Sequence, residues 1–151
     1  MSDFEDTLNA LLVSTFDTIL KYESASLADL PGPSVTIAEA HMIEFIAGQD
    51  GQATGSSIAT GRHLALPTVT VAVKKMEQKG YIRKVRSTQD GRRIYVHLTE
   101  QGMRINRAHS LMHQRMVRHI SNQFSPDQKD TLLTAVQQLS DFFLGLAGGR
   151  Q

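Results

Sequence analysis

Histidines are the residues of this 151-residue chain whose spacing could bind a metal. His109 and His113 are four positions apart, so a helix would place both on one face, as in helical zinc sites. A third histidine, His41, could complete such a site if the fold brought it near. A pair alone is more often at the surface or hydrogen-bonded in a core. Metal binding is therefore one hypothesis, and it has no cysteine ligand because the chain has none.

A basic block is the second feature that could do chemistry. Residues 74–107 carry ten Lys or Arg against Glu77, Asp90 and Glu100, a net of +7, whereas residues 1–50 carry a net of −8. The whole chain has a formal net charge of only +1. Such a concentration of cations is typical of a surface that binds a polyanion such as DNA. The alternative is an ordinary solvated surface.

Several classes of protein are excluded by what the sequence lacks. Without cysteine there are no disulfides, thiolate zinc sites or cysteine nucleophiles. No Gly-rich phosphate loop or nucleophile elbow is present, so a histidine–metal hydrolase is the only enzymatic alternative and we expect no enzyme. No apolar run approaches the ~18–20 residues of a membrane span. The acidic N-terminus is unlike a signal peptide, and we therefore expect a cytoplasmic protein.

The elements that must position these residues are predicted by periodicity and capping signals. Apolar residues recur at three- and four-residue steps, Thr36 and Glu39 have the spacing of a capping box, and Asp90–Gly91 is a hairpin turn signal. We expect a mainly α fold with one small β-hairpin. The expected helices lie at about 3–28, 37–47, 54–62, 67–80, 99–120 and 125–147, and the expected strands at about 81–85 and 94–98.

The order of these elements is that of a winged helix-turn-helix. The helix at 67–80 would enter the DNA major groove, and the basic hairpin tip would reach the minor groove. Threonine can contact base edges or phosphates, valine can touch a thymine methyl group, and lysine and arginine neutralise phosphate. The predicted DNA-contacting residues are Thr68, Thr70, Val71, Lys74, Lys75, Arg86, Arg92 and Arg93.

Long amphipathic helices at both ends predict a homodimer. A ~60-residue winged core could not cover their apolar stripes, which include Phe142 and Phe143. We expect one domain over 1–151, with a DNA-binding lobe at 36–98 and a dimerisation region at 1–30 and 99–147. A two-fold dimer places two recognition helices about one DNA turn apart, which fits a pseudo-palindromic operator. The alternative is a monomer whose terminal helices pack on one another.

The chain resembles the MarR (multiple antibiotic resistance regulator) family over nearly its whole length. The resemblance rests on the segments Leu66–Thr70, Lys79–Ile82, Asp90–Arg92 and Leu98–Gly102. It implies a transcriptional regulator, most often a repressor, that is a homodimer with interlocked terminal helices. It also implies that Arg92 reaches the minor groove and that Asp90 orients it. The third helix departs from the pattern, because Arg62 and His63 stand where the family usually has an apolar residue and a glycine; Arg62 could instead reach a phosphate.

The resemblance also brings the helices carrying His41 and His109 together at an effector crevice. In the zinc-uptake repressors of the family these positions bind zinc with a carboxylate, for which Glu23 is the candidate here. In the fatty-acid-synthesis repressors the effector is an acyl chain on acyl carrier protein. The running sequence is more similar to the second branch, notably at 37–43, 80–87 and 107–113.

We therefore predict control of fatty-acid synthesis through acyl carriers, with no required cofactor. The alternatives are a zinc-responsive repressor of metal uptake and a regulator of efflux or stress genes that responds to a small apolar ligand. The predicted effector-site residues are His41, Met42, His109, Met112 and His113. The predicted zinc ligands are Glu23, His41, His109 and His113.

Overall fold

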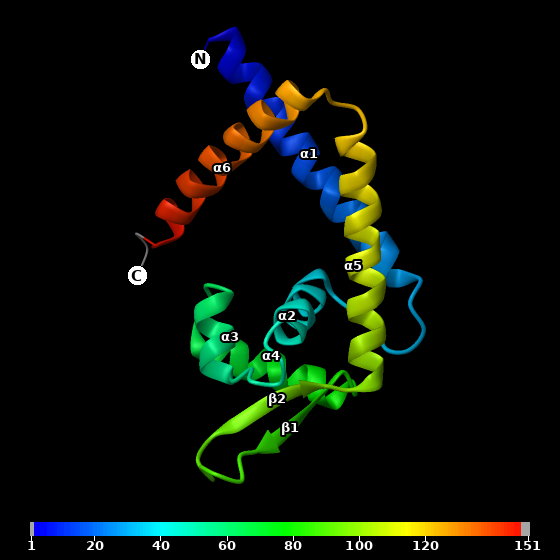
Figure 1. The fold of residues 1–151 in the computed structure, drawn as a ribbon, viewed down its shortest axis with the longest axis vertical. Helices are drawn as coiled ribbons and strands as arrows, with labels where there is room; N and C mark the ends of the chain where they lie inside the picture. Colours follow the sequence, from blue (N-terminus) through cyan, green and yellow to red (C-terminus); the bar gives the residue numbers. More distant parts are fainter. Residues whose placement is uncertain (1, 149–151) are drawn as a thin grey trace. The chain divides into compact units, whose positions relative to one another are not determined.

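The computed structural model describes residues 2–148, and it divides into two compact units, Met1–Met112 and His113–Gln151. The predicted mainly α fold with one β-hairpin is confirmed (Figure 1). The elements are α1 (Asp3–Ala28), α2 (Ile37–Ala47), α3 (Gly55–Gly61), α4 (Leu66–Gln78), β1 (Ile82–Arg86), β2 (Ile94–Leu98), α5 (Glu100–Ser121) and α6 (Pro126–Gly148). The boundary between the units falls within α5. Residues 1 and 149–151 of the predicted domain lie outside the described residues.

Local capping explains where α2, α3 and α4 begin. The Thr36 hydroxyl accepts from the Glu39 backbone N–H at 3.2 Å, and the Glu39 carboxylate accepts from the Thr36 N–H at 2.9 Å. Thr54 and Ser57 form the same reciprocal pair at the start of α3. α4 has no side-chain cap, but Pro67 lies in its first turn, where a missing N–H costs nothing.

One hydrophobic core holds α2, α3, α4 and the hairpin together within the first unit. Half of its twelve buried side chains come from α2 and α4, and Tyr81 is the largest fully buried one. The core residues are Met42, Ile43, Ile46, Ala53, Ile58, Val69, Val73, Met76, Tyr81, Ile82, Val96 and Ile105. This core fixes the face of α4 that is left for solvent.

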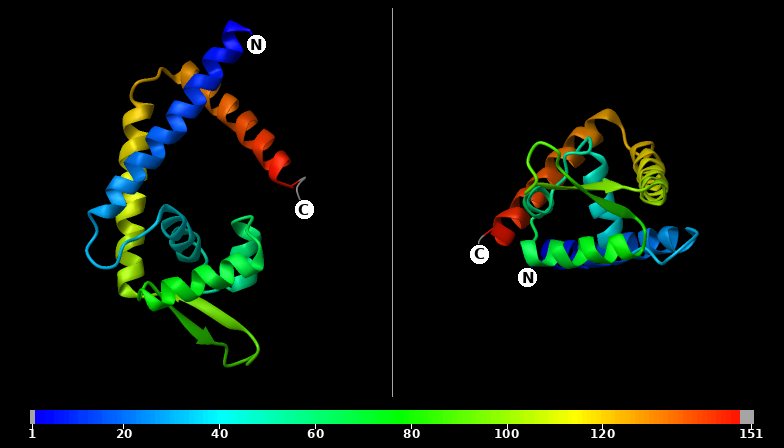
Figure 2. Two further views of the ribbon diagram at one scale, coloured as in Figure 1. Left: turned by 180° about the vertical axis from the view of Figure 1, so that it is seen from behind. Right: turned by 90° about the horizontal axis from the view of Figure 1, so that it is seen from below.

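The hairpin is antiparallel, with register running from Ile82↔Leu98 to Arg86↔Ile94. The alternation at 94–98 predicts one buried face, and Val96 is indeed buried. Ile94 is 43% exposed, so that part of the prediction is wrong. The physical reason is that the hairpin extends past the helices that form the core, as the left view in Figure 2 shows. Tyr81, also expected in the first strand, immediately precedes it.

A partly buried polar network ties the start of α2 to the end of α4. Lys79 Nζ lies 2.8 and 2.9 Å from the two carboxylate oxygens of Glu39 and donates to the Ser34 carbonyl at 2.8 Å. The Tyr81 hydroxyl donates to the Pro33 carbonyl at 2.6 Å. An anion at the N-terminus of one helix and a cation at the C-terminus of another both suit the helix dipoles. The network therefore fixes α4 relative to α2.

Gly102 allows α5 to approach the backbone of Tyr81, just before β1, and Gly102→Ala is expected to destabilise the protein by about 1–3 kcal/mol. A Cβ at this position would overlap the Tyr81 backbone carbonyl, which cannot move like a flexible side chain. The matched control is Gly48→Ala, since φ there is −75° and the nearest atom to a Cβ is 3.6 Å away. Urea denaturation of the three proteins checks this. Equal unfolding midpoints for Gly102→Ala and the parent would contradict the packing.

The terminal helices expose most of their apolar side chains in the single chain. No described residue of α6 is buried, and only Glu23 and Leu27 are buried in α1. The large exposed apolar residues of α6 are Leu132, Leu133, Val136, Phe142, Phe143, Leu144 and Leu146.

Within residues 2–148, no helix combines the length and the apolarity needed to cross a membrane.

Candidate functional site

The outward face of α4 carries the residues predicted to contact DNA. Val69, Val73 and Met76 bury the other face in the core. The Thr70 hydroxyl donates to the Leu66 carbonyl at 3.0 Å, and its oxygen can still accept a bond from outside. The exposed residues of the predicted set on this helix are Thr68, Thr70, Val71, Lys74 and Lys75.

The wing turn is held by its own side chains. Asp90 Oδ1 accepts from the backbone N–H of Arg92 at 3.0 Å, so Asp90 positions Arg92 through its main chain. Arg86 Nη1 donates to the Gly91 carbonyl at 2.7 Å and closes the turn from β1. Arg86, Asp90, Arg92 and Arg93 are all exposed. The turn therefore presents Arg92 to solvent on a backbone held by Asp90 within the turn and by Arg86 of β1.

A large crevice lies among α1, α2 and α4 within the first unit. It has a volume of about 970 Å³. Its walls are mainly apolar, with Leu20 from α1, Met42 from α2 and Leu64 from the connection between α3 and α4. The sequence predicted Met42 and His41 for this site, and both line the crevice. Met112 is buried but is not among the lining residues.

One wall of the crevice is α4, the helix predicted to enter the major groove. Thr68, Val71 and Lys75 line it, whereas Thr70 and Lys74 do not. Thr68, Val71 and Lys75 are spaced i, i+3 and i+7 and therefore share one side of α4. The residues predicted to read DNA thus divide into two groups, and one group also borders the crevice. A ligand bound there would touch α4 directly.

The segment at the end of α3 differs in sequence from the pattern that the resemblance implies. Its backbone conformation nevertheless explains why that pattern has a glycine at the position of His63. His63 has φ of 53°, in the left-handed region that favours glycine. At Gly61 a Cβ would overlap the Phe45 ring, so the glycine at the end of α3 has a packing role. Arg62 is exposed and lines the crevice beside α4. Arg62 thus adds a cation to the crevice that the periodicity alone did not predict.

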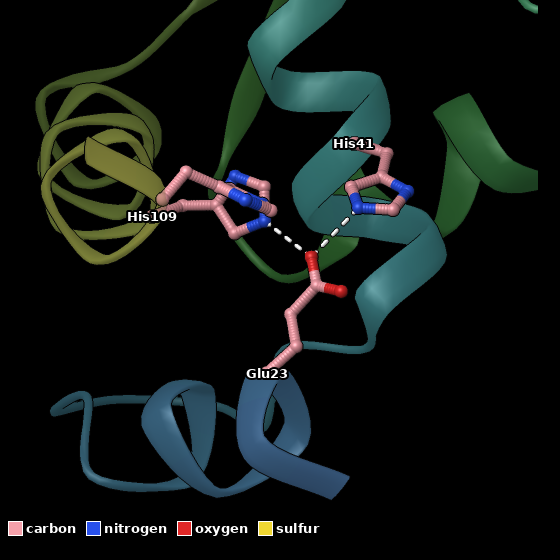
Figure 3. A group of neighbouring side chains, drawn as sticks. Glu23, His41 and His109 are labelled. Carbon is pink, nitrogen blue, oxygen red and sulfur yellow. Dashed lines mark hydrogen bonds and ion pairs between the residues drawn. The ribbon is translucent and has the colours of Figure 1, made fainter. Parts of the chain in front are cut away.

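Glu23, His41 and His109 meet beside the crevice, although they come from α1, α2 and α5 (Figure 3). The Nε2 atoms of His41 and His109 lie 2.7 and 2.6 Å from the same carboxylate oxygen, Glu23 Oε1. Glu23 is 3% exposed and His109 is 2% exposed. Burial alone would raise the Glu23 pKa, but the hydrogen bonds from His109 and His41 and their positive charge outweigh it and hold the pKa below its usual value of 4.5.

The donor set of this cluster fits a divalent metal. The ligand atoms of Glu23, His41 and His109 lie within 4.8 Å of one another, and His113 follows one turn beyond His109 on α5. Imidazole nitrogens with one carboxylate oxygen are typical zinc ligands. Glu44 Oε2 lies 3.5 Å from His109 Nδ1, where it can orient the ring. The sequence analysis did not predict that Glu44 belongs to this cluster. Its position three residues after His41 on α2 is the only local signal that could have indicated it.

Glu23→Gln is expected to lower the thermal stability at neutral pH and to have a smaller effect in acid. A carboxylate whose pKa is lowered in the folded state stabilises it above the unfolded pKa, and this contribution is lost as pH falls through the folded pKa. Thermal denaturation with a chelator, from about pH 7 to about pH 3, measures the difference. Asp17→Asn, at an exposed position of the same helix, is the control. A difference that stays constant across this range would contradict the assignment.

Comparisons with known proteins agree with the geometry of the site. Residues 34–108 match the family model of the transcriptional regulator SarA/Rot. The HTH-type transcriptional regulator SarZ of Staphylococcus haemolyticus (strain JCSC1435) is 29% identical over 72 residues, which are 48% of this chain and 48% of that protein. The alignment thus spans about half the length of this curated relative.

Two solved structures cover nearly all of the chain. Streptococcus pneumoniae FabT in complex with DNA is 31% identical, covers 94% of this chain and 99% of its own, and has a TM-score of 0.87. AbsC, a MarR family transcriptional regulator from Streptomyces coelicolor, shares the fold at 18% identity and a TM-score of 0.77, covering 96% of this chain and 97% of its own. The chain belongs to the MarR/SarA family of winged-helix transcriptional regulators, which are DNA-binding proteins and not enzymes.

Proposed function

We propose that this protein is a repressor that binds a pseudo-palindromic operator as a homodimer and responds to an acyl chain presented by acyl carrier protein. The observation that carries the effector proposal is the apolar crevice of about 970 Å³ whose one wall is α4. The running sequence at 37–43, 80–87 and 107–113, which resembles the fatty-acid-synthesis repressors, supports the acyl chemistry. The genes under control would then be those of fatty-acid synthesis.

DNA binding would use α4 in the major groove and the wing in the minor groove. The exposed lysines of α4 and arginines of the wing supply the charge that releases counterions from DNA. Operator affinity should therefore fall steeply as salt rises. The dimer would be formed by the apolar faces of the terminal helices, which are exposed in the single chain.

The acyl chain would bind by burying its methylene groups against the crevice walls. Each buried methylene contributes about 0.8 kcal/mol, so binding should strengthen with chain length until the crevice is filled. Because Thr68, Val71 and Lys75 border the crevice, an occupant there changes the surroundings of the recognition helix. Coupling between effector and operator then needs no long path through the protein.

Filling the crevice tests this effector proposal. Ala38 is exposed and lines the crevice near the start of α2. Ala38→Trp should abolish the change in operator affinity caused by long-chain acyl carrier protein while operator binding without it persists. Ala38→Ser leaves the volume open and should respond like the parent. An unchanged acyl response in Ala38→Trp, measured by fluorescence anisotropy on operator DNA, would exclude the crevice as the acyl site.

Zinc is the second candidate effector, and the Glu23 cluster is the observation that favours it. Its imidazole nitrogens and its carboxylate oxygen lie close enough to share one ion. A bound zinc ion would act as a Lewis acid that links these side chains in place of their hydrogen bonds. Glu23 and His41 belong to helices that also line the crevice, through Leu20 and Met42, so either effector would act on the same helices.

A triple variant with His41, His109 and His113 replaced by alanine distinguishes the two effectors. If zinc is the effector, calorimetry should find tight binding to the parent, weaker binding as pH falls through ~6.5, and none to the variant. If an acyl chain is the effector, zinc binds both proteins weakly and long-chain acyl carrier protein shifts the operator affinity of the parent. If neither ligand changes operator binding, both effector proposals are wrong and the cluster is a structural network.

A further inference from the structure

The connection between α1 and α2, residues 29–36, is docked on the hydrophobic core of the first unit. Leu30 and Val35, near its two ends, both pack against that core. Between them, the rings of Pro31 and Pro33 restrict two of the φ angles of the backbone. The connection is therefore a short, stiff segment that is anchored at both ends.

Two polar side chains hold the middle of this connection by its backbone carbonyls. The Tyr81 hydroxyl donates to the Pro33 carbonyl at 2.6 Å, and Lys79 Nζ donates to the Ser34 carbonyl at 2.8 Å. Lys79 follows the last residue of α4, and Tyr81 immediately precedes β1. The connection is thus tied to the point where α4 ends and the wing begins.

Tyr81 is also the backbone root of the wing. Its N–H donates to the Met76 carbonyl of α4 at 2.9 Å, and its carbonyl accepts from the Thr99 N–H at 3.0 Å. Thr99 lies between β2 and α5, and its hydroxyl donates to the Gly80 carbonyl at 2.5 Å. Tyr81 therefore joins the base of both strands to α4 and, through its hydroxyl, to the connection that comes from α1.

The hydroxyl of Tyr81 serves this link and not the packing of the core. The Tyr81 ring is fully buried among apolar side chains, a role that phenylalanine would fill equally well. Burial and the charge of the Glu39 carboxylate raise the pKa of Tyr81, so the hydroxyl stays protonated and donates at neutral pH. Exchange of this tyrosine for phenylalanine thus removes the link and keeps the core.

The direction of the wing decides whether Arg92 can reach the minor groove. Asp90 and Arg86 hold the turn itself, but they lie at the opposite end of the hairpin from its root. A small tilt at the root moves the tip of the hairpin furthest, so a groove contact requires support at the base. We propose that Tyr81 is a positioning residue for DNA binding, whose hydroxyl bond to the Pro33 carbonyl sets the direction of the wing and so places Arg92 in the minor groove. This inference rests on the proposed mode of DNA binding.

A double-mutant cycle tests whether Tyr81 acts through Arg92. Tyr81→Phe should weaken operator binding by about threefold to tenfold, because it removes one hydrogen bond that holds the wing. In the Arg92→Ala background the same change should have little further effect, since the contact that Tyr81 positions is already gone. Losses that simply add would overturn the proposal, because a role confined to folding does not depend on Arg92.

The operator sequence and a control variant complete the test. The parent should prefer A·T over G·C pairs beneath the wing, and Tyr81→Phe should lower this ratio of affinities by about threefold or more. Tyr22→Phe, which removes an exposed hydroxyl from α1, should keep the ratio of the parent. An unchanged ratio in Tyr81→Phe, with or without a lower thermal midpoint, would overturn this proposal alone. An Arg92→Ala protein that binds both operators like the parent would overturn the proposed mode of DNA binding as well.

Discussion

Placing aspartate at Val136 and Phe143 of α6 is expected to yield a monomer whose affinity for a full operator is at least about 100-fold lower. These side chains are 52% and 48% exposed in the single chain and lie at the centre of the apolar stripe of the helix. Burying such a stripe against a partner is the main free-energy source for a dimer, and two charges on it oppose that burial. A monomer holds one half-site and loses the gain from engaging both halves at once.

Sedimentation and operator binding measure the two consequences together. The matched control places aspartate at Thr134 and Gln138, which are exposed on the opposite side of α6. This control should remain dimeric and keep its operator affinity. An unchanged dimer in the Val136 and Phe143 variant would show that α6 does not form the interface. A monomer with undiminished affinity for the palindrome would refute the two-fold architecture.

Sequence alone predicts those parts of the fold that depend on neighbouring residues. The capping box of Thr36 and Glu39 and the proline of α4 are local signals, and the helices begin where these signals place them. The apolar spacing at Val69, Val73 and Met76 likewise predicts a buried face that the structure confirms. Such patterns succeed because helix geometry is set within one or two turns.

Other features depend on how far an element extends or on what approaches it. Alternation along β2 predicts which side chains share a face, but it cannot tell that Ile94 lies beyond the core. In the sequence, Gly102 is only the last residue of the Leu98–Gly102 motif. In the structure its missing side chain leaves room for the Tyr81 carbonyl. Neither the reach of a hairpin nor the approach of two backbones has a local signature.

The histidine cluster required knowledge of the fold. Glu23 is 18 residues from His41 and 86 from His109, and no periodic pattern relates positions so far apart. The family resemblance supplied the expectation, and the structure brings the three side chains together. The sequence also could not show which of the predicted DNA-contacting residues of α4 border the crevice. Val71 and Lys75 do so, but this is visible only once the crevice is known.

Arg92→Ala is expected to weaken operator binding by about 1–3 kcal/mol without loss of folding stability. The Arg92 side chain is exposed, and the bond that orients it joins its backbone N–H to Asp90, so truncation leaves the turn intact. Arg86→Ala should differ, because it removes the bond to the Gly91 carbonyl and loosens the turn itself. The affinity of each variant for operator DNA and its thermal midpoint separate these two roles.

The DNA sequence under the wing provides the sharper test of the Arg92 role. An arginine in the minor groove gains most from the narrow, strongly negative groove of an A·T tract. Exchanging the A·T pairs beneath the wing for G·C should therefore weaken the parent protein and have little effect on Arg92→Ala. Arg104→Ala, which removes an equal charge from α5, should keep the A·T preference. If parent and Arg92→Ala lose the same affinity on the G·C operator, Arg92 does not read the groove, and the basic wing acts only through charge.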